Sequence, residues 1–420
     1  MRSGAGQVFD VIVVGAGPAG AAAALALAAK GFSIAVIGRA GAGRSGVQGL
    51  SARALVSLNE AGLGAAAACA SELVPRRVSW AGERSQRGQE ALIDRGGFDA
   101  RLRASGCWME ASVQGLAFVD GAWEVETDRG GGGHGGRVRG RALLDARGRF
   151  ARRCDERGPL LVSWSIVLES GRSEVPRSAL AALEDGWCWF GVTGSGILCA
   201  QFVGSAHQRL SHVEVGERVR RAVRDLGLFE PQIDLLLREG TYHACAAVAR
   251  YSRPSRGPGC LRIGDAAVAM DPLSGNGIHE AIRSAHVAAA AINSLLLGES
   301  WDVVARFVDE RARELWRRSV SAAAGFYGLQ AEWCGSEFWR LASASYARAA
   351  MEALPQVEGD GRFEMRPVLN SDRIELHRVW VSPDWPRGVW KFKGRSLEEV
   401  PVAQISSQLR RGASAAPHEV

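Results

Sequence analysis

The N-terminal segment alternates between apolar runs and one glycine-rich turn. Residues 9–14 are rich in β-branched side chains, residues 15–20 read Gly-Ala-Gly-Pro-Ala-Gly, an alanine-rich stretch follows, and residues 32–37 are apolar again. Strand, glycine turn, helix and strand in this order are typical of a βαβ unit in a parallel sheet. The pattern therefore predicts a Rossmann-like α/β fold.

Shorter alternating runs in the middle of the chain predict a second, antiparallel layer. Residues 160–168, 187–192 and 196–203 alternate apolar and polar positions and are separated by turn residues. Because residues 139–145 and 259–264 resemble further strands of the first fold, we expect this β layer to be an insertion. A long helical pattern over residues 301–351 then precedes a segment that is rich in proline and aromatic residues.

These patterns divide the chain into three expected parts. The predicted domains are a discontinuous nucleotide-binding domain of residues 1–75, 96–155 and 254–350, a β-sheet substrate domain of residues 76–95 and 156–253, and a small C-terminal appendage of residues 351–420.

In the glycine turn, each glycine has a different expected task. Gly15 permits the tight turn out of the strand, Gly17 lets the backbone approach a diphosphate, and Gly20 lets helix and strand pack closely. The start of the helix, at Pro18 and Ala19, would add amide donors and a partial positive charge. We therefore expect these five residues to bind a dinucleotide.

One partner that such a site usually has is missing at the end of the second strand. An acidic residue that binds ribose hydroxyls is expected there, but the chain reads Val-Ile-Gly38-Arg39. The ribose contact must then come from the backbone or from elsewhere in the chain. Arg39 faces either a phosphate, as in an NADP site, or solvent.

A second motif lies in the later part of the predicted nucleotide-binding domain. Asp265 follows a strand, and an aspartate there could accept hydrogen bonds from ribitol hydroxyls. A glycine-rich helix start aimed at a flavin could stabilise negative charge on the reduced ring. The predicted binding residues in this motif are Asp265, Pro272, Gly275, Asn276, Gly277 and Ile278.

Together, the two motifs resemble the FAD-dependent monooxygenases of the p-hydroxybenzoate hydroxylase type, which are related to flavin-dependent halogenases and geranylgeranyl reductases. Residues 94–102 and 144–149 are similar to two further signatures of this family, and the resemblance covers residues 9–345. It implies that the first motif holds FAD. The sequence shows no second glycine turn between a strand and a helix. The resemblance therefore also implies that NAD(P)H has no Rossmann domain of its own.

The same resemblance implies roles for individual residues. It places Arg95 near the FAD diphosphate and Arg44 and Ser45 in a loop near the cofactor. Pro272 would lie beside the flavin ring where oxygen reacts.

The composition of the chain excludes several classes of protein. A chain of 420 residues that is 47% hydrophobic and 23% charged can bury a large core, which excludes disorder as its main state. No apolar run reaches the roughly 18–20 residues of a membrane helix, and no secretory signal is seen at the N-terminus, so the cytoplasm is the expected location. Eight cysteines without a CxxC pair argue against a zinc ribbon, a dithiol centre or a disulfide framework.

The net charge of +6 comes from basic residues that are spread along the chain. This distribution does not point to nucleic acid, and an acidic ligand or an acidic partner protein would fit it equally well. Of the 51 basic residues only Lys30, Lys391 and Lys393 are lysines.

The shortage of lysine bears on the reaction. Flavin-dependent halogenases carry a tryptophan pair followed by Ile-Pro and a lysine that holds the oxidised halogen, whereas this chain has Trp187 and Trp189 without Ile-Pro and no lysine at a matching position. Oxygenation is therefore favoured over halogenation, and a reductase acting on isoprenoid chains stays open. In this family, reduced flavin and O2 form a C4a-hydroperoxide that hydroxylates an electron-rich ring in a site from which water is excluded.

Four residues are candidates for substrate contacts. Trp187 and Trp189 would share one face of a strand, where they line the substrate cavity or belong to the core. His243 and Tyr251 are further candidates, although no general base is assigned. His279 and His286 lie seven residues apart without a further ligand, so no metal site is expected.

A finer resemblance concerns residues 264–282, 326–333 and 337–340. They resemble the flavoproteins that mature tryptophylquinone cofactors in quinohemoprotein amine dehydrogenase and in lysine or glycine oxidases. This implies a tryptophan of a precursor polypeptide as substrate, with NAD(P)H as reductant and O2 as co-substrate. A packed helical pair would explain the aromatic residues equally well. A small-molecule aromatic hydroxylase and a flavin-binding assembly factor without oxygenase activity remain alternatives.

Overall fold

The computed structural model describes most of the chain. The described residues are 8–39, 46–106, 108–129, 133–151, 154–227, 230–330, 333, 335–352, 361–382, 385, 388–392 and 395–396. Arg44 and Ser45 lie outside them. Among the described helices, none is both long and apolar enough to cross a membrane.

A mainly parallel sheet forms the first layer, as the N-terminal pattern predicts. Its central strand β1 (Val8–Val14) pairs in parallel with β2 (Ile34–Gly38) on one side and β9 (Gly133–Asp145) on the other. The full order is β17-β18-β9-β1-β2-β6, and β7 and β8 extend it antiparallel from β9. The remaining strands are β6 (Met109–Glu110), β7 (Ser112–Val119), β8 (Ala122–Arg129), β17 (Ser255–Gly257) and β18 (Cys260–Arg262).

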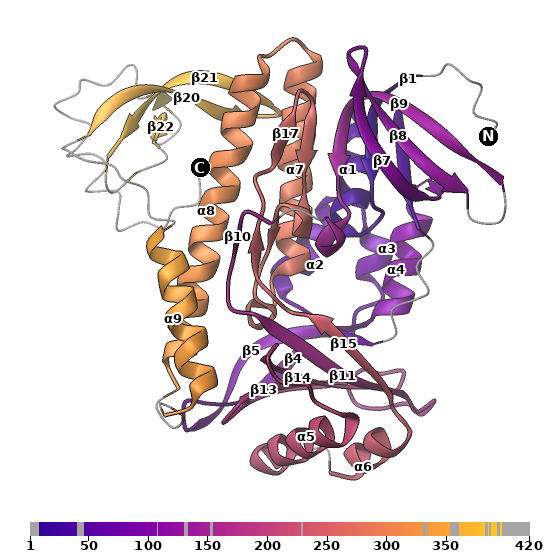
Figure 1. Cartoon of the computed structure of the whole chain (residues 1–420), viewed down its shortest axis with the longest axis vertical. Coiled ribbons are helices and arrows are strands. Elements are labelled where there is room, and N and C mark those ends of the chain that lie inside the picture. The colour runs from indigo at the N-terminus through magenta and orange to yellow at the C-terminus, as the bar shows by residue number, and fades with distance from the viewer. Residues whose placement is uncertain are drawn as a thin grey trace.

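Helices cover one face of this sheet. Helix α1 (Pro18–Ala28) packs along α7 (Gly277–Leu296), and both lie against a core that includes Val11, Leu144 and Leu261. Figure 1 shows α1 and α7 standing side by side in the upper half of the molecule. Nearby lie α2 (Ala52–Glu60), α3 (Gly64–Ala67) and α4 (Arg95–Ala104).

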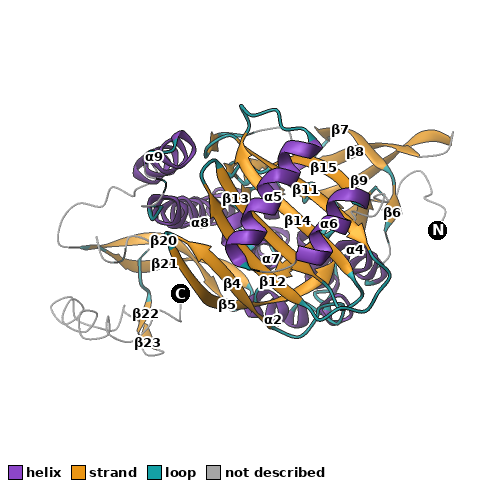
Figure 2. Cartoon of the chain, turned by 90° about the horizontal axis from the view of Figure 1, so that it is seen from below, coloured by secondary structure: helices purple, strands orange, loops and turns teal. Residues whose placement is uncertain are grey.

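The inserted β layer is a second sheet with the order β15-β11-β14-β13-β12-β4-β5-β3. It is antiparallel except where β12 runs parallel to β4, and it confirms the predicted antiparallel layer. Helices α5 (His212–Leu226) and α6 (Glu230–Glu239) lie across its outer face (Figure 2). The strands are β3 (Val47–Leu50), β4 (Val74–Trp80), β5 (Glu83–Asp94), β11 (Leu161–Glu169), β12 (Arg177–Leu183), β13 (Gly186–Val192), β14 (Ile197–Ser205) and β15 (Thr241–Ala246).

The helical C-terminal region flanks both sheets (Figure 1). The predicted helical stretch is two helices, α8 (Trp301–Gly328) and α9 (Glu337–Glu352), which pack against each other. The segment that follows forms a hairpin of β20 (Arg362–Asn370) and β21 (Arg373–Val381) against α7 and α8. Ile374 of this hairpin is buried in the core of the first layer, so the predicted appendage extends that core.

Short elements connect these parts near the two motifs. The three-stranded sheet β10-β16-β19 consists of β10 (Glu156–Arg157), β16 (Arg250–Tyr251) and β19 (Val268–Ala269). The single-turn helices are η1 (Gly148–Phe150), η2 (Gly264–Ala266) and η3 (Pro272–Ser274), and a hairpin of β22 (Lys391–Phe392) and β23 (Arg395–Ser396) lies near the C-terminus.

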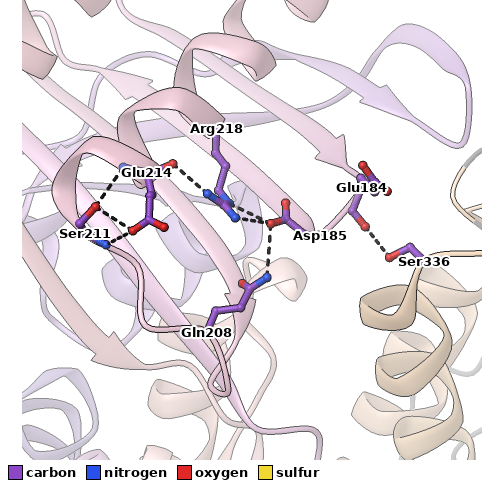
Figure 3. A network of polar contacts seen from close by, with 7 residues as sticks. All are labelled: Glu184, Asp185, Gln208, Ser211, Glu214, Arg218 and Ser336. Atoms are coloured by element: carbon purple, nitrogen blue, oxygen red, sulfur yellow. Dashed lines mark hydrogen bonds and ion pairs between the residues drawn. The ribbon is translucent and has the colours of Figure 1, made fainter.

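The turn between β12 and β13 holds the second sheet to both helical regions (Figure 3). Arg218 of α5 donates to the Asp185 carboxylate through Nε and Nη2, at 2.9 and 2.6 Å. From the other side, Ser336 donates to the backbone carbonyl of Glu184, and Trp339 of α9 donates to that of Leu183 at 2.8 Å. The start of β13 is thereby fixed between α5 and the α8–α9 pair.

The outer face of the second sheet predicts a stability effect. Phe202 is fully buried under α5, with its ring 5.8 Å from that of Trp164. We expect Phe202→Ala to lower the free energy of unfolding by about 3–5 kcal/mol, because it leaves a cavity that the sheet cannot close. Urea denaturation measures this. Val213→Ala, at an exposed position of α5, is the control and should change the free energy by less than about 0.5 kcal/mol. Equal, small effects of both substitutions would contradict the described packing.

Candidate functional site

The glycine turn joins β1 to α1 in the way that its spacing predicts. Gly15 has a φ of +109°, and a Cβ there would collide with the backbone of Ala146 at the end of β9. A Cβ at Gly20 would collide with the carbonyl of Gly15. Gly17 differs, because a Cβ there would have no heavy atom within 4 Å. Two of the glycines therefore permit close packing, and Gly17 borders open space at the start of α1.

The second motif lies directly against the first. Gly264 has a φ of +58°, and a Cβ there would lie 2.9 Å from the Cβ of Ala19 and 3.6 Å from that of Ala281. The backbone N–H of Gly264 donates to Ser284 Oγ of α7 at 2.8 Å. Contact between α1 and η2 thus brings residues 15–20 and residues 264–278 together, although more than two hundred positions of the sequence separate them.

The loop that precedes α7 is shaped by its own residues. Asp271 accepts a hydrogen bond from the backbone N–H of Leu273 at 2.8 Å and so begins η3. Gly275 ends that turn with a φ of +61°, and Gly277 begins α7. No side chain caps the N-terminus of α7 or that of α1 in the described chain, so amide donors at both helix starts stay available for a ligand.

Asp265 lies beside this loop and forms an ion pair. Its Oδ2 accepts from Arg149 Nε at 3.2 Å, and both side chains are about one third exposed. Arg149 also donates to the backbone carbonyls of Val248 and Met270, at 2.8 and 3.0 Å. Arg149 lies in the signature of residues 144–149, which assigned it no role of its own. It joins η1 to the segment between Asp265 and Pro272.

The end of β2 explains the missing acidic residue. A Cβ at Gly38 would lie 3.1 Å from the Trp108 ring and 3.1 Å from the Cβ of Ala16. Glu110 of the neighbouring strand β6 is paired with Gly38, and its side chain is exposed. An exposed carboxylate therefore stands next to the position where the pattern lacks one. Arg39 is also exposed.

Arg95 begins α4 and is held by neighbouring side chains. It donates to Gln48 Oε1 at 2.8 Å and to Asp99 Oδ1 at 2.7 Å. Asp94 caps the helix by accepting from the backbone N–H groups of Gly96 and Gly97. Since Gln48 belongs to β3, these contacts join Arg95 at the start of α4 to the second sheet.

A buried carboxylate joins the loop before α7 to the helical pair. Asp271 Oδ2 accepts from the hydroxyls of Tyr346 on α9 and Tyr327 on α8, the latter at 3.2 Å. Tyr327 in turn accepts from Trp187 Nε1 of β13 at 3.0 Å. Burial raises the pKa of Asp271, while the hydrogen bonds from Tyr346, Leu273 and Tyr327 act in the opposite direction. Three elements, η3, α8 and α9, thus meet at one carboxylate, and Tyr327 connects it to β13.

The aromatic candidates on β13 alternate as predicted. Trp187 and Trp189 belong to the core between the sheet and α8–α9, while Cys188 and Phe190 pack under α5 and α6. Trp189 Nε1 donates to the buried Glu90 at 3.0 Å, and Glu90 also accepts from Ser178. Both indole N–H groups are therefore satisfied within the protein.

The other two substrate candidates lie in different surroundings. His243 is exposed on β15 at the edge of the sheet, paired with Ser165. Tyr251 is buried against Trp316 and lies under the guanidinium of Arg313, 4.5 Å from its ring centre. Burial raises the pKa of Tyr251 to about 12, which makes it a poor base near neutral pH.

Comparison with known proteins is consistent with this geometry. A family model described as an FAD binding domain matches residues 8–90. Among solved structures, the peptidyl tryptophan dihydroxylase QhpG, essential for tryptophylquinone cofactor biogenesis, matches with a TM-score of 0.80 and 29% identity over 98% of this chain and 96% of that one. This chain is therefore similar to the group A flavoprotein monooxygenases.

More distant structures share the fold of this flavoprotein. The flavin-dependent halogenase CmlS has a TM-score of 0.69 and 19% identity, over 98% of this chain and 90% of that one. The myxobacterial chondrochloren halogenase CndH has a TM-score of 0.62 and 21% identity, over 80% and 86% of the two chains. A search of curated protein sequences returned no match.

The residues of the flavoprotein fit FAD. The open space at Gly17 and the uncapped start of α1 suit a diphosphate, whose oxygens would accept from the backbone N–H groups there. Asp265 is partly exposed and could accept from ribitol hydroxyls. The start of α7, at Gly277 and Ile278, offers amides and a positive dipole end to the electron-rich edge of a flavin ring.

The two kinds of glycine predict opposite effects. Gly17→Ala should leave the free energy of unfolding of the apoprotein within about 0.5 kcal/mol of the wild-type value, because the added methyl group meets no protein atom. The methyl group should weaken FAD binding by about tenfold or more, because it stands where the diphosphate would approach. Gly20→Ala should instead lower the stability of the apoprotein by about 1–3 kcal/mol. Flavin fluorescence titration and thermal unfolding separate the two, and wild-type FAD affinity of Gly17→Ala would contradict the assignment.

Asp271 predicts a pH effect on stability. Because burial raises its pKa, ionising this carboxylate costs more in the folded than in the unfolded protein, so the wild type loses stability as the pH rises from about 4 through the folded pKa. Asp271→Asn removes this titration. The free energy of unfolding of the variant minus that of the wild type should therefore rise with pH above about 4. Urea denaturation at a series of pH values measures it. A difference that falls with pH would mean that the tyrosine hydrogen bonds outweigh burial.

Proposed function

We propose that this flavoprotein is an NAD(P)H-dependent monooxygenase that hydroxylates the tryptophan side chain of a partner polypeptide during biogenesis of a tryptophylquinone cofactor. The observation that carries the proposal is the likeness to QhpG over almost the whole of both chains. The likeness includes the α8–α9 pair and the C-terminal hairpin, since nearly all of this chain is covered.

The lysines support oxygenation over halogenation. Lys30 lies at the end of α1 and pairs with Asp372 at 2.6 Å, and Lys391 lies over the Trp390 ring in the C-terminal segment. Lys393, the remaining lysine, is outside the described residues. Neither described lysine is near the loop that precedes α7, where a halogenase lysine would have to serve the flavin.

The proposed reaction is the hydroxylation of an indole ring, and its atoms and electrons balance as follows. An aromatic C–H bond, O2, NAD(P)H and a proton give a C–OH bond, NAD(P)+ and water. FAD, when bound, supplies the transfer of two electrons from NAD(P)H to O2. The protein's part is to hold the indole close to the flavin and to exclude water from the site.

One face of the second sheet is suited to hold an indole. Trp189, Gln201, Ser165 and His243 are successive cross-strand partners on β13, β14, β11 and β15, so they lie on one face. This face carries apolar side chains toward α8 and polar side chains toward the edge at β15. His243 is exposed at that edge, where a polypeptide could reach it. Because Trp189 is buried in the core between the sheet and α8–α9, an indole ring would lie at the polar side of this face, where its N–H would find acceptors.

The test uses the FAD-loaded protein, a precursor polypeptide with the target tryptophan, NADH and O2. We expect the precursor to gain the mass of one oxygen atom per round of hydroxylation, with one NADH consumed per round. A precursor with phenylalanine in place of the target tryptophan is the control and should gain no mass.

Other outcomes would select the alternatives. Hydroxylation of small aromatic compounds without any mass gain in the precursor would favour a small-molecule hydroxylase. If Gly17→Ala, tested at an FAD concentration too low to load it, still bound the precursor and supported cofactor formation, the protein would be an assembly factor. Either result would overturn the proposed function.

A further inference from the structure

Two hollows lie next to each other between α7 and α8. They share Glu280 of α7 and Leu315 and Arg318 of α8 as lining residues. Their empty volumes are about 730 and 710 Å³, partly open to solvent. Together they form a groove along α8, which we call the α7–α8 groove.

Small side chains on α8 leave room for the groove. Ala312, Ser319, Ala322 and Ala323 line it, whereas the large residues Trp316, Val320 and Tyr327 of the same helix are buried in the core against the second sheet. The floor of the first hollow is apolar and comes from Leu261, Ile263 and Val268. The groove is therefore a consequence of how α8 distributes its side chains between two faces.

One end of the groove reaches the expected flavin. The second hollow is lined by Asp271, Leu273, Ser274 and Asn276, which belong to the loop before α7. The first hollow extends away from that loop to Val308. From Val308 to Phe326, the first and last residues of α8 that line the two hollows, there are 18 helical steps, so the hollows together extend along about 27 Å of α8 at 1.5 Å per residue. The groove is suited to an elongated ligand with one end beside the flavin.

The end away from the flavin is positively charged. The lining of the first hollow includes the arginines Arg262, Arg283, Arg311 and Arg318 against one acidic residue, Glu280. Glu280 is itself 3.8 Å from the Arg283 guanidinium. The excess of positive charge favours an anionic ligand, and guanidinium groups are well suited to phosphate oxygens.

We propose that the α7–α8 groove binds the nicotinamide dinucleotide that reduces the flavin. Its diphosphate would lie among the arginines, its flat rings would lie on the apolar floor, and its nicotinamide would point to the loop at Asp271–Asn276. The proposal rests on the proposed function in one respect, namely that NAD(P)H is the reductant. It explains how a chain with one glycine turn between a strand and a helix could hold two dinucleotides.

The test measures binding and reduction separately in the FAD-loaded protein. NAD+ and NADP+ are titrated by calorimetry, and flavin reduction by NADH is followed without oxygen. We expect Arg311→Gln to weaken NAD+ binding about tenfold or more and to raise the NADH concentration for half-maximal reduction by a similar factor. The limiting reduction rate and the FAD affinity should stay unchanged. Ala312→Trp, which fills the groove, should have the same effect without a change of charge.

A matched control lies on the same helix. Arg306 is outside the groove and donates to Glu310 at 2.9 Å, so Arg306→Gln removes the same charge and should leave NAD+ binding unchanged. Unchanged NAD+ affinity in both groove variants would overturn the proposal.

Two further results separate this inference from the proposed function. If Arg311→Gln lost affinity for the precursor polypeptide instead of NAD+, the groove would belong to the polypeptide, and the proposal would be overturned. If the groove variants lost NAD+ while the wild type failed to oxygenate the precursor, the groove assignment would hold and the substrate assignment would fail.

Discussion

The contact between Gly264 and Ala19 is the constraint on which the rest of the site depends. Because Gly264 has no side chain and a φ of +58°, η2 can lie against the first turn of α1. This close approach places the uncapped starts of α1 and α7 in one region, although each belongs to a different part of the sequence. A larger residue at position 264 would separate the helices and with them the two ends of the site. Binding of one FAD by both motifs therefore depends on this packing contact as much as on the groups that would touch the ligand.

A second constraint holds the loop before α7 in relation to the substrate sheet. Asp271 begins η3 and also receives hydrogen bonds from tyrosines on α8 and α9, one of which is bonded to Trp187. Burying a carboxylate is costly, and three donors in fixed positions offset much of that cost. The network therefore connects the loop before α7, the helical pair and the second sheet. The aromatic residues of the helical pair thus have the packing role that their sequence pattern also allowed.

Much of the fold could be predicted from local pattern, because strand and helix periodicity, the glycine turn and the alternation of Trp187 and Trp189 need only neighbouring residues. The rest depends on contacts between distant segments. Asp271 is 56 and 75 positions from its two tyrosines, and no local signal pairs them. Likewise, Glu110 belongs to β6 and Trp108 directly precedes it, and a strand of two residues is too short to show a periodic pattern. Trp108 nevertheless leaves little room for a side chain at position 38, and Glu110 places a carboxylate beside that position. The α7–α8 groove became visible only when the two helices were placed together.

The central claim is that residues 15–20 and residues 264–278 bind one and the same FAD. Hydrogen–deuterium exchange during titration with FAD tests it most directly, because it reports on the backbone amides of both segments separately. The account predicts that the starts of α1 and α7 gain protection together, along one saturation curve that ends at one FAD per chain. Protection of only one segment, or protection of the two at different FAD concentrations, would contradict it.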